Sequence, residues 1–137
     1  MGFRRSTARV LLIFTGSVYG VGAFAQQADD RQWLKVFTAN DMAVLYVRKA
    51  DLGAAQLGKD VWIKTVNADG SWALNRLKFD CPRNMSDMRQ WLSYNKAGDL
   101  TSSYDVPDSE HHWSGIAPGT SGETLAKFAC LVVPKKH

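Results

Sequence analysis

The residues of this chain that could do chemistry are concentrated around two adjacent histidines. His111 and His112 follow Asp108 and Glu110, and imidazole and carboxylate groups are ligands that zinc accepts. Side chains of neighbouring residues in an extended segment point to opposite sides, so such a pair rarely holds one ion. The simpler interpretation is a solvated polar loop before Trp113. We therefore expect no metal and no other cofactor.

Catalysis finds little support in the rest of the chain. A free thiol is unavailable if the only two cysteines, Cys81 and Cys130, are bonded to each other. The sequence has no G-x-S-x-G elbow, and no spacing singles out a Ser, His and Asp trio. Paired carboxylates for glycoside hydrolysis cannot be assigned either, and a glycosidase usually needs a deeper cleft than so short a domain provides. We predict that the protein is not an enzyme.

The first 25 residues have the composition of a secretory signal peptide. Three arginines precede an apolar stretch that ends in Ala-Phe-Ala at residues 23–25, the small-x-small pattern that signal peptidase recognises. We predict cleavage between Ala25 and Gln26, with no lipid-attachment cysteine there. The apolar stretch is shorter than the roughly 20 residues that a bilayer span requires, so we expect no membrane span after cleavage. An uncleaved membrane anchor is the alternative.

Removal of residues 1–25 changes the charge of the protein. The full chain has 17 basic and 13 acidic residues, a net charge of +4, and three of the basic residues but none of the acidic ones lie in residues 1–25. The mature chain would therefore carry 14 basic against 13 acidic residues, or +1. Such a weak field does not favour nucleic acid or anionic lipid as partners.

An exported chain meets an oxidising environment, in which two cysteines tend to pair. We predict a disulfide between Cys81 and Cys130 in a periplasmic, cell-surface or secreted protein. The closed loop would contribute about 4 kcal/mol on a chain-entropy estimate. Two reduced, buried thiols are the alternative.

Six segments after residue 32 have the β-former content or the alternation of strands. They are residues 33–37, 43–47, 61–66, 72–81, 85–94 and 100–106. The segment 72–81 is the clearest, because Leu77, Phe79 and Cys81 alternate with Lys78 and Asp80. Residues 85–94 also fit a helical spacing, and we favour a strand. Residues 26–32 are expected to be a loose N-terminal segment, and residues 50–59 and 107–119 connections.

A helix is expected at the C-terminal end of the domain. Thr120 and Glu123 form a capping box, in which each side chain satisfies the backbone donor of the other residue. Pro134 would end the helix. The expected apolar stripe comprises Leu125, Phe128, Ala129 and Val132. The predicted fold class is α+β: an antiparallel sheet of about six strands with the C-terminal helix packed on it, stapled by one disulfide.

Several of these segments resemble one family. They are residues 78–81 (Lys-Phe-Asp-Cys), 113–116 (Trp-Ser-Gly-Ile) and 118–123 (Pro-Gly-Thr-Ser-Gly-Glu), with Leu125 and Cys130 and, upstream, Tyr46-Val47, Asp51-Leu52 and Val61-Trp62. Together they are similar to the surface-adhesin protein E-like domain of proteobacteria, which residues 33–133 would form. The resemblance implies a six-stranded sheet with a disulfide-linked helix. It also implies a relation to a lipid-anchored adhesin that binds host matrix and serum proteins.

The expected function is therefore that of an exported, non-enzymatic binding module of the cell envelope. Its expected partner is a protein, with host matrix proteins among the candidates. Lys64, Arg76 and Lys78 would form a cationic binding face if their strands pair, although a solvated outer face is the simpler interpretation. The tryptophans that could form a ligand platform, or fill the core instead, are Trp62, Trp72, Trp91 and Trp113.

Two other functions remain open at this point. The first is a small periplasmic inhibitor of a lysozyme-type hydrolase, with the loop 105–119 as its plug. The second is a structural envelope protein that forms a homodimer.

Overall fold

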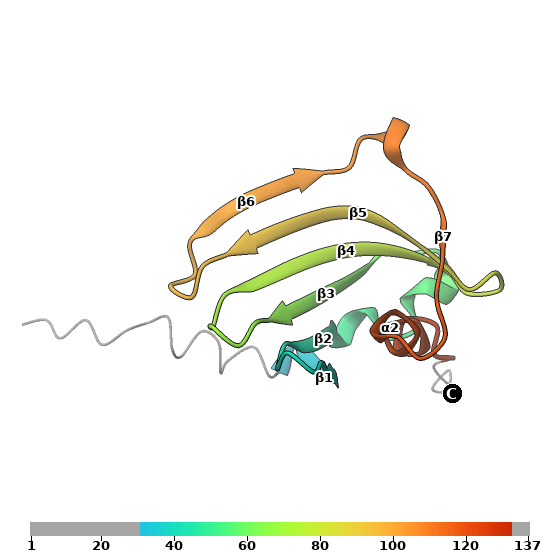
Figure 1. Ribbon diagram of the computed structural model, residues 1–137. Coiled ribbons are helices and arrows are strands. Elements are labelled where there is room, and N and C mark those ends of the chain that lie inside the picture. The colour runs from blue at the N-terminus through green and yellow to red at the C-terminus, as the bar shows by residue number, and fades with distance from the viewer. Residues whose placement is uncertain (1–30, 133–137) are drawn as a thin grey trace, which may run out of the picture.

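The computed structural model describes residues 31–132 (Figure 1). The predicted signal peptide, the cleavage point between Ala25 and Gln26, most of the 26–32 segment and Pro134 lie outside the described residues. These predictions stay untested.

The described chain is organised around one antiparallel sheet. Its strands are β1 (Trp33–Thr38), β2 (Val44–Arg48), β3 (Val61–Val66), β4 (Trp72–Asp80), β5 (Met85–Tyr94), β6 (Leu100–Asp105) and β7 (Ser114–Gly115). The first six lie in chain order, each paired with the next, and β7 pairs with the start of β5. With the C-terminal helix and the disulfide, this confirms the predicted fold class. Strand β7 was missed, because its two residues are too few to show a pattern.

Two tight turns keep consecutive strands adjacent. The β3–β4 turn ends at Gly70 (φ 86°) and the β5–β6 turn at Gly98 (φ 89°). Both are left-handed conformations that glycine adopts without steric cost. A Cβ on Gly70 would lie 3.3 Å from the Cβ of Lys96, so the two turns also approach each other closely.

Strand β5 resolves the ambiguity of residues 85–94 in favour of a strand. It pairs along its length with β4 and with β6 and β7 on its other side. A strand flanked on both sides has its backbone donors and acceptors satisfied by its neighbours. This pairing makes residues 85–94 a strand, although Met88 and Leu92 also have the spacing of a helix.

The helix α2 (Ser121–Ala129) begins close to the predicted residue. The Thr120 hydroxyl accepts from the Glu123 backbone N–H at 3.4 Å, as a capping box requires. The Glu123 carboxylate, however, accepts from the backbone N–H of Gly119 at 2.9 Å and not from that of Thr120. This hydrogen bond, together with the Lys127 ammonium, lowers the pKa of Glu123.

The helix ends earlier than predicted. Its last residue is Ala129, and Val132 lies outside it and is 82% exposed. The reason is tertiary: the Gly53 N–H donates to the Phe128 carbonyl at 3.1 Å, and the Gln56 side-chain amide donates to the Cys130 carbonyl at 2.8 Å. The segment between β2 and β3, which contains the short 3-10 helices η2 (Lys49–Asp51) and η3 (Ala54–Leu57), therefore caps α2.

The core lies between α2 and one face of the sheet. Its buried residues are Val47, Ala54, Ala55, Val61, Ile63, Phe79, Leu125, Ala126 and Ala129. Leu77 and Cys81 pack against this cluster, as the alternation of residues 72–81 predicted. Cys81 and Cys130 form a disulfide with a Cα–Cα distance of 5.8 Å, which ties the end of α2 to the residue after β4.

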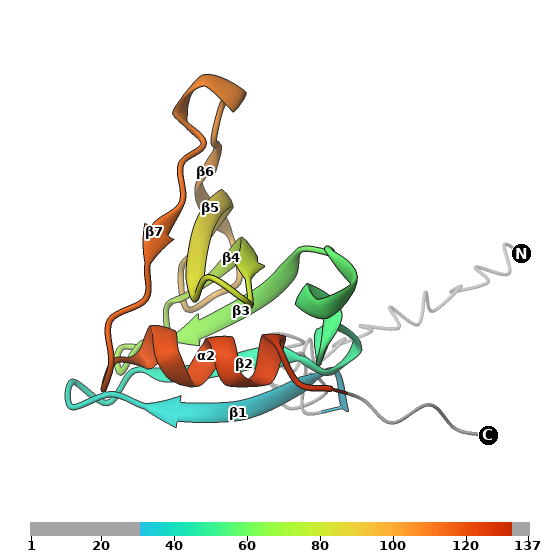
Figure 2. The ribbon, with the colours of Figure 1, turned by 90° about the vertical axis from the view of Figure 1, so that its right-hand side faces the viewer.

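The helix covers only part of that face. Figure 2 shows α2 lying across β1, β2 and β3, while β5 and β6 rise away from it as the sheet twists. The fold therefore has a helix-covered end, β1 to β3 with the last residues of β4, and an uncovered end, β5 and β6.

Candidate functional site

Two aromatic side chains stand at the centre of the uncovered end. Trp91 on β5 is paired with Tyr104 on β6, and directly opposite residues of antiparallel strands lie on the same face. Their ring centroids are 5.7 Å apart with an interplanar angle of 49°. Trp91 is 46% and Tyr104 40% exposed. Neither ring is used by the core.

Small polar residues surround this aromatic pair. Asn75 on β4 lies opposite Trp91, and the next pair of β5 and β6 on the same face is Ser93 with Ser102. Trp and Tyr offer large, rigid contact areas at low entropic cost, and Ser and Asn offer adaptable hydrogen bonds. This combination is typical of surfaces that bind proteins. We call Asn75, Trp91, Ser93, Ser102 and Tyr104 the aromatic platform.

The platform lies on the same face of the sheet as the core. Asn75, Leu77 and Phe79 alternate along β4 and so point to one side. Phe79 is buried in the cluster that includes Leu125 and Ala129 of α2, while Asn75 is half-buried between Ile63 on β3 and the exposed Trp91 on β5. The platform is therefore the part of the inner face that the helix leaves open.

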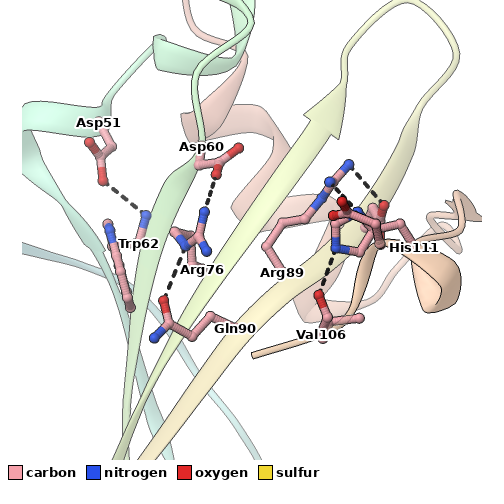
Figure 3. A network of polar contacts seen from close by, with 10 residues as sticks. Asp51, Asp60, Trp62, Arg76, Arg89, Gln90, Val106 and His111 are labelled. Carbon is pink, nitrogen blue, oxygen red and sulfur yellow. Dashed lines mark hydrogen bonds and ion pairs between the residues drawn. The ribbon is translucent and has the colours of Figure 1, made fainter. Parts of the chain in front are cut away.

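The loop 105–119 is braced against β5 rather than loose (Figure 3). The pairing of β4 with β5 shifts so that Arg89 is an extra residue on β5, and a bulge of this kind redirects a side chain. The Arg89 guanidinium lies 2.6 Å from Nδ1 of His111 and 3.0 Å from the buried Asp87 carboxylate. The backbone N–H of Val106 donates to the Arg89 carbonyl at 3.0 Å.

His111 acts as a structural residue in this brace. Its Nε2 lies 2.8 Å from the Val106 carbonyl oxygen. Since Nδ1 faces the Arg89 guanidinium, which only donates, the contacts fit the tautomer that carries its hydrogen on Nε2. His112 instead has Nδ1 3.1 Å from the Glu110 carbonyl oxygen. The two predicted histidines therefore have separate partners. Within residues 31–132, no three His, Cys, Asp or Glu side chains are grouped to hold a metal ion.

A hollow of about 670 Å³ lies between β5 and this loop. It lies beside residues 87–89 of β5, between the part of β5 that pairs with β6 and the part that pairs with β7. The lining residues combine apolar and polar side chains. They are Leu77, Ser86, Asp87, Met88, Val106, Glu110, His112 and Ser114.

The uncovered end is also acidic. Between Lys96 and Lys127 the chain contains no Lys or Arg but five carboxylate residues. Asp99, Asp105, Asp108 and Glu110 belong to β6 and the segments that flank it, and the fifth, Glu123, lies in α2. The Tyr104 hydroxyl donates to the Glu110 carboxylate at 2.6 Å, and this hydrogen bond raises the pKa of Tyr104. A single-sign charge of this kind attracts partners of opposite charge.

The predicted cationic residues Lys64, Arg76 and Lys78 lie on one face of the paired strands β3 and β4, the face opposite to α2. Lys64 is only 5% exposed, with its ammonium 4.9 Å from the Trp72 ring centroid and 5.8 Å from that of Trp33.

Arg76 is engaged within the fold as well. It donates to Asp60 at 2.7 Å and to Gln90 at 3.2 Å (Figure 3), and Lys78 is half-buried. The role of these three cations as a binding face stays a prediction.

The other three predicted tryptophans are half-buried. Trp72 stacks on Tyr94 with ring centroids 3.8 Å apart. The Trp62 backbone N–H donates to the Asp51 carboxylate at 2.9 Å. The Arg83 guanidinium lies over Trp113, 5.7 Å from the centroid of the Trp113 ring. Among the four candidates, Trp91 has the most exposed side chain.

The sequence prediction did not single out Tyr104 or the acidic stretch. Tyr104 lies in a Ser- and Thr-rich strand and needs the β5–β6 register to become the neighbour of Trp91. The acidic stretch can be seen in the sequence as a run of 30 positions without Lys or Arg. The net charge of the whole chain does not reveal it, because basic residues elsewhere cancel its negative charge.

Comparison of the chain with models of known protein families, with curated proteins and with solved structures finds no match. The similarity to the surface-adhesin protein E-like domain stays a prediction. No helix within residues 31–132 is long and apolar enough to cross a membrane.

Proposed function

We propose that this chain is an exported, non-enzymatic binding module of the cell envelope that recognises a protein partner through the aromatic platform. The observation that carries the proposal is the exposed Trp91–Tyr104 pair, 5.7 Å apart at the end of the sheet that α2 leaves open. Trp and Tyr are enriched among the residues that anchor protein interfaces.

Two further observations support the proposal. The disulfide between Cys81 and Cys130 is a feature of proteins that work in an oxidising compartment, which favours the periplasm, the cell surface or secretion. Since these are the only cysteines of the chain, the bond also leaves no thiol nucleophile. The resemblance to an adhesin family adds host matrix or serum proteins to the candidate partners.

The test compares binding of three versions of the protein to immobilised laminin and fibronectin and to the proteins of a periplasmic extract. The double variant Trp91→Ala/Tyr104→Ala should bind at least about tenfold more weakly than the unchanged protein, because interface aromatics are frequent hot spots. The control is Leu57→Ala, which removes an exposed apolar side chain of η3. It should bind normally. Equal binding by all three versions, or no specific binding by the unchanged protein, rejects the proposal.

A second candidate function is inhibition of a lysozyme-type hydrolase. It is favoured by the loop 105–119, which Figure 1 shows projecting beyond the end of β6. The loop is fixed from inside by Arg89 and His111 and carries the fully exposed carboxylate of Asp108. A rigid, projecting loop can enter an enzyme cleft at little entropic cost. Muramidase activity should fall in the presence of the unchanged protein and recover with Arg89→Ala, which removes the brace. Undiminished activity with the unchanged protein excludes this candidate.

A further inference from the structure

Strand β6 is an open edge of the sheet. It ends the strand order, pairing with β5 on one side only, and all six of its residues are exposed. Figure 1 shows it as the outermost strand. Open edges present unpaired backbone groups that another chain can bind.

The register of β5 and β6 identifies which backbone groups face outward. The Val106 N–H donates to the Arg89 carbonyl, so Val106 faces β5. In an antiparallel ladder successive residues alternate between facing the neighbouring strand and facing away from it. Ser103 and Asp105 therefore direct their N–H and C=O groups away from the sheet, where a further strand would pair.

The charges of this edge argue against a second copy of the chain. Asp99 and Asp105 stand three positions before and after Ser102. Asp99 directly precedes β6 and Asp105 is its last residue. In the antiparallel register centred on Ser102, two copies would place Asp99 of each copy opposite Asp105 of the other, and like charges directly opposite each other destabilise a strand pair. Natural edges are often guarded by lysine, whereas this one has none between residues 97 and 126.

We infer that β6 binds an extended segment of the partner protein as an additional antiparallel strand, and that this segment carries Lys or Arg near both ends, opposite Asp99 and Asp105. The inference rests on the proposed function and names the kind of partner segment. Main-chain hydrogen bonds to Ser103 and Asp105 would supply affinity, and the two end charges would supply selectivity. The six residues of β6 span about 20 Å, so a segment of about seven residues is long enough.

The test uses the isotope-labelled, exported protein and the synthetic peptide Lys-Thr-Val-Thr-Val-Thr-Lys. Amide hydrogen exchange followed by NMR should show new protection at Ser103 and Asp105 when the peptide is added. A peptide with Glu at both ends should bind about tenfold more weakly, as expected for two exposed charge pairs. Equal binding of the two peptides, or protection elsewhere, overturns the inference. So does protection of both amides without peptide at rising protein concentration, because a second copy would then occupy the edge.

Two variants separate the edge from the platform. Asp99→Asn/Asp105→Asn should remove the preference for the Lys peptide while retaining the fold. Ser103→Pro should weaken the binding of both peptides by about tenfold. The change removes an outward N–H that does not pair with β5 but would pair with the peptide.

Leu57→Ala on η3, outside β6 and the aromatic platform, is the matched control, and it should leave peptide binding unchanged. If partner binding depends on Trp91 but neither peptide binds β6, the edge inference fails and the proposed function stands. If Trp91→Ala does not weaken partner binding, the proposed function is rejected, whatever the peptide experiment shows.

Discussion

The helix-covered and uncovered ends of the sheet use the same alternation of side chains for different purposes. Under α2, Ile63 and Phe79 are at most 5% exposed. On the same face beyond the helix, Trp91 and Tyr104 keep two-fifths or more of their surface in water. The strands therefore supply apolar positions along the whole face, and the position of α2 decides which of them become core and which stay available for a partner.

The charges differ between the two ends as well. In the helix-covered end, Asp51 is buried and accepts hydrogen bonds from Arg48 and from the Trp62 backbone N–H. In the uncovered end, Asp105 and Asp108 are exposed. Asp51 thus holds the covered end together, whereas at the uncovered end Asp105 and Asp108 are directed outward and only Asp87, paired with Arg89, has a comparable internal role among the described carboxylates of β5 and β6.

The largest effect should come from cutting the covalent link between α2 and the sheet. The variant Cys81→Ala/Cys130→Ala opens a loop with a sequence separation of 49 residues. It should lose about 4 kcal/mol of unfolding free energy on the chain-entropy model. Chemical denaturation followed by tryptophan fluorescence measures this loss. An unchanged midpoint would mean that packing alone holds the helix.

The next largest effect compares one aromatic residue from each end. Phe79→Ala leaves a cavity under α2 and should cost about 3 kcal/mol. Trp91→Ala removes a larger side chain from a half-exposed site and should cost less than about 1 kcal/mol. The same denaturation experiment measures both. Similar losses would show that the Trp91 side chain also supports the fold, which contradicts the division into two ends.

A smaller effect should follow from removing the charge of the buried carboxylate. Asp51→Asn keeps the size of the side chain but weakens its charge-assisted bonds to Arg48, so we expect a loss of about 1–3 kcal/mol. Asp108→Asn is the control at the uncovered end, where the change should stay within about 0.5 kcal/mol. A loss at Asp108 as large as that at Asp51 would refute the contrast.

The smallest effect concerns the pH dependence of the uncovered end. The hydrogen bond to Glu110 raises the pKa of Tyr104 above its usual 10.0. Any stability that this bond contributes is therefore fully present below pH 10 and is lost as the pH rises through the raised pKa.

The control variant for this titration is Glu110→Gln, which retains an acceptor but removes the charge. NMR titration should show its Tyr104 pKa returning toward 10.0. A Tyr104 pKa that does not change in this variant would show that Glu110 is not the cause.

Much of the fold follows from local patterns in the sequence. Alternation in residues 72–81 marked Leu77 and Phe79 as inward, and β3 has the bounds that the sequence predicted. The turn at Gly70 and the start of α2 after Thr120 were also predictable, because each depends on the chemistry of a few neighbouring residues. The cysteine pair followed from the number of cysteines and the expected compartment.

Other features were decided by tertiary structure, because they depend on contacts between distant residues. Pairing with β4 and β6 makes residues 85–94 a strand. Gly53 and Gln56 end α2 at Ala129 by taking its last carbonyls. Tryptophan rings cover the predicted surface cation Lys64.

The same holds for the candidate site. A strand sequence shows that two faces exist, but it does not show where a helix lies across one of them. The length and direction of α2, set by its cap and its disulfide, leave Trp91 and Tyr104 exposed, and only the strand register brings them together.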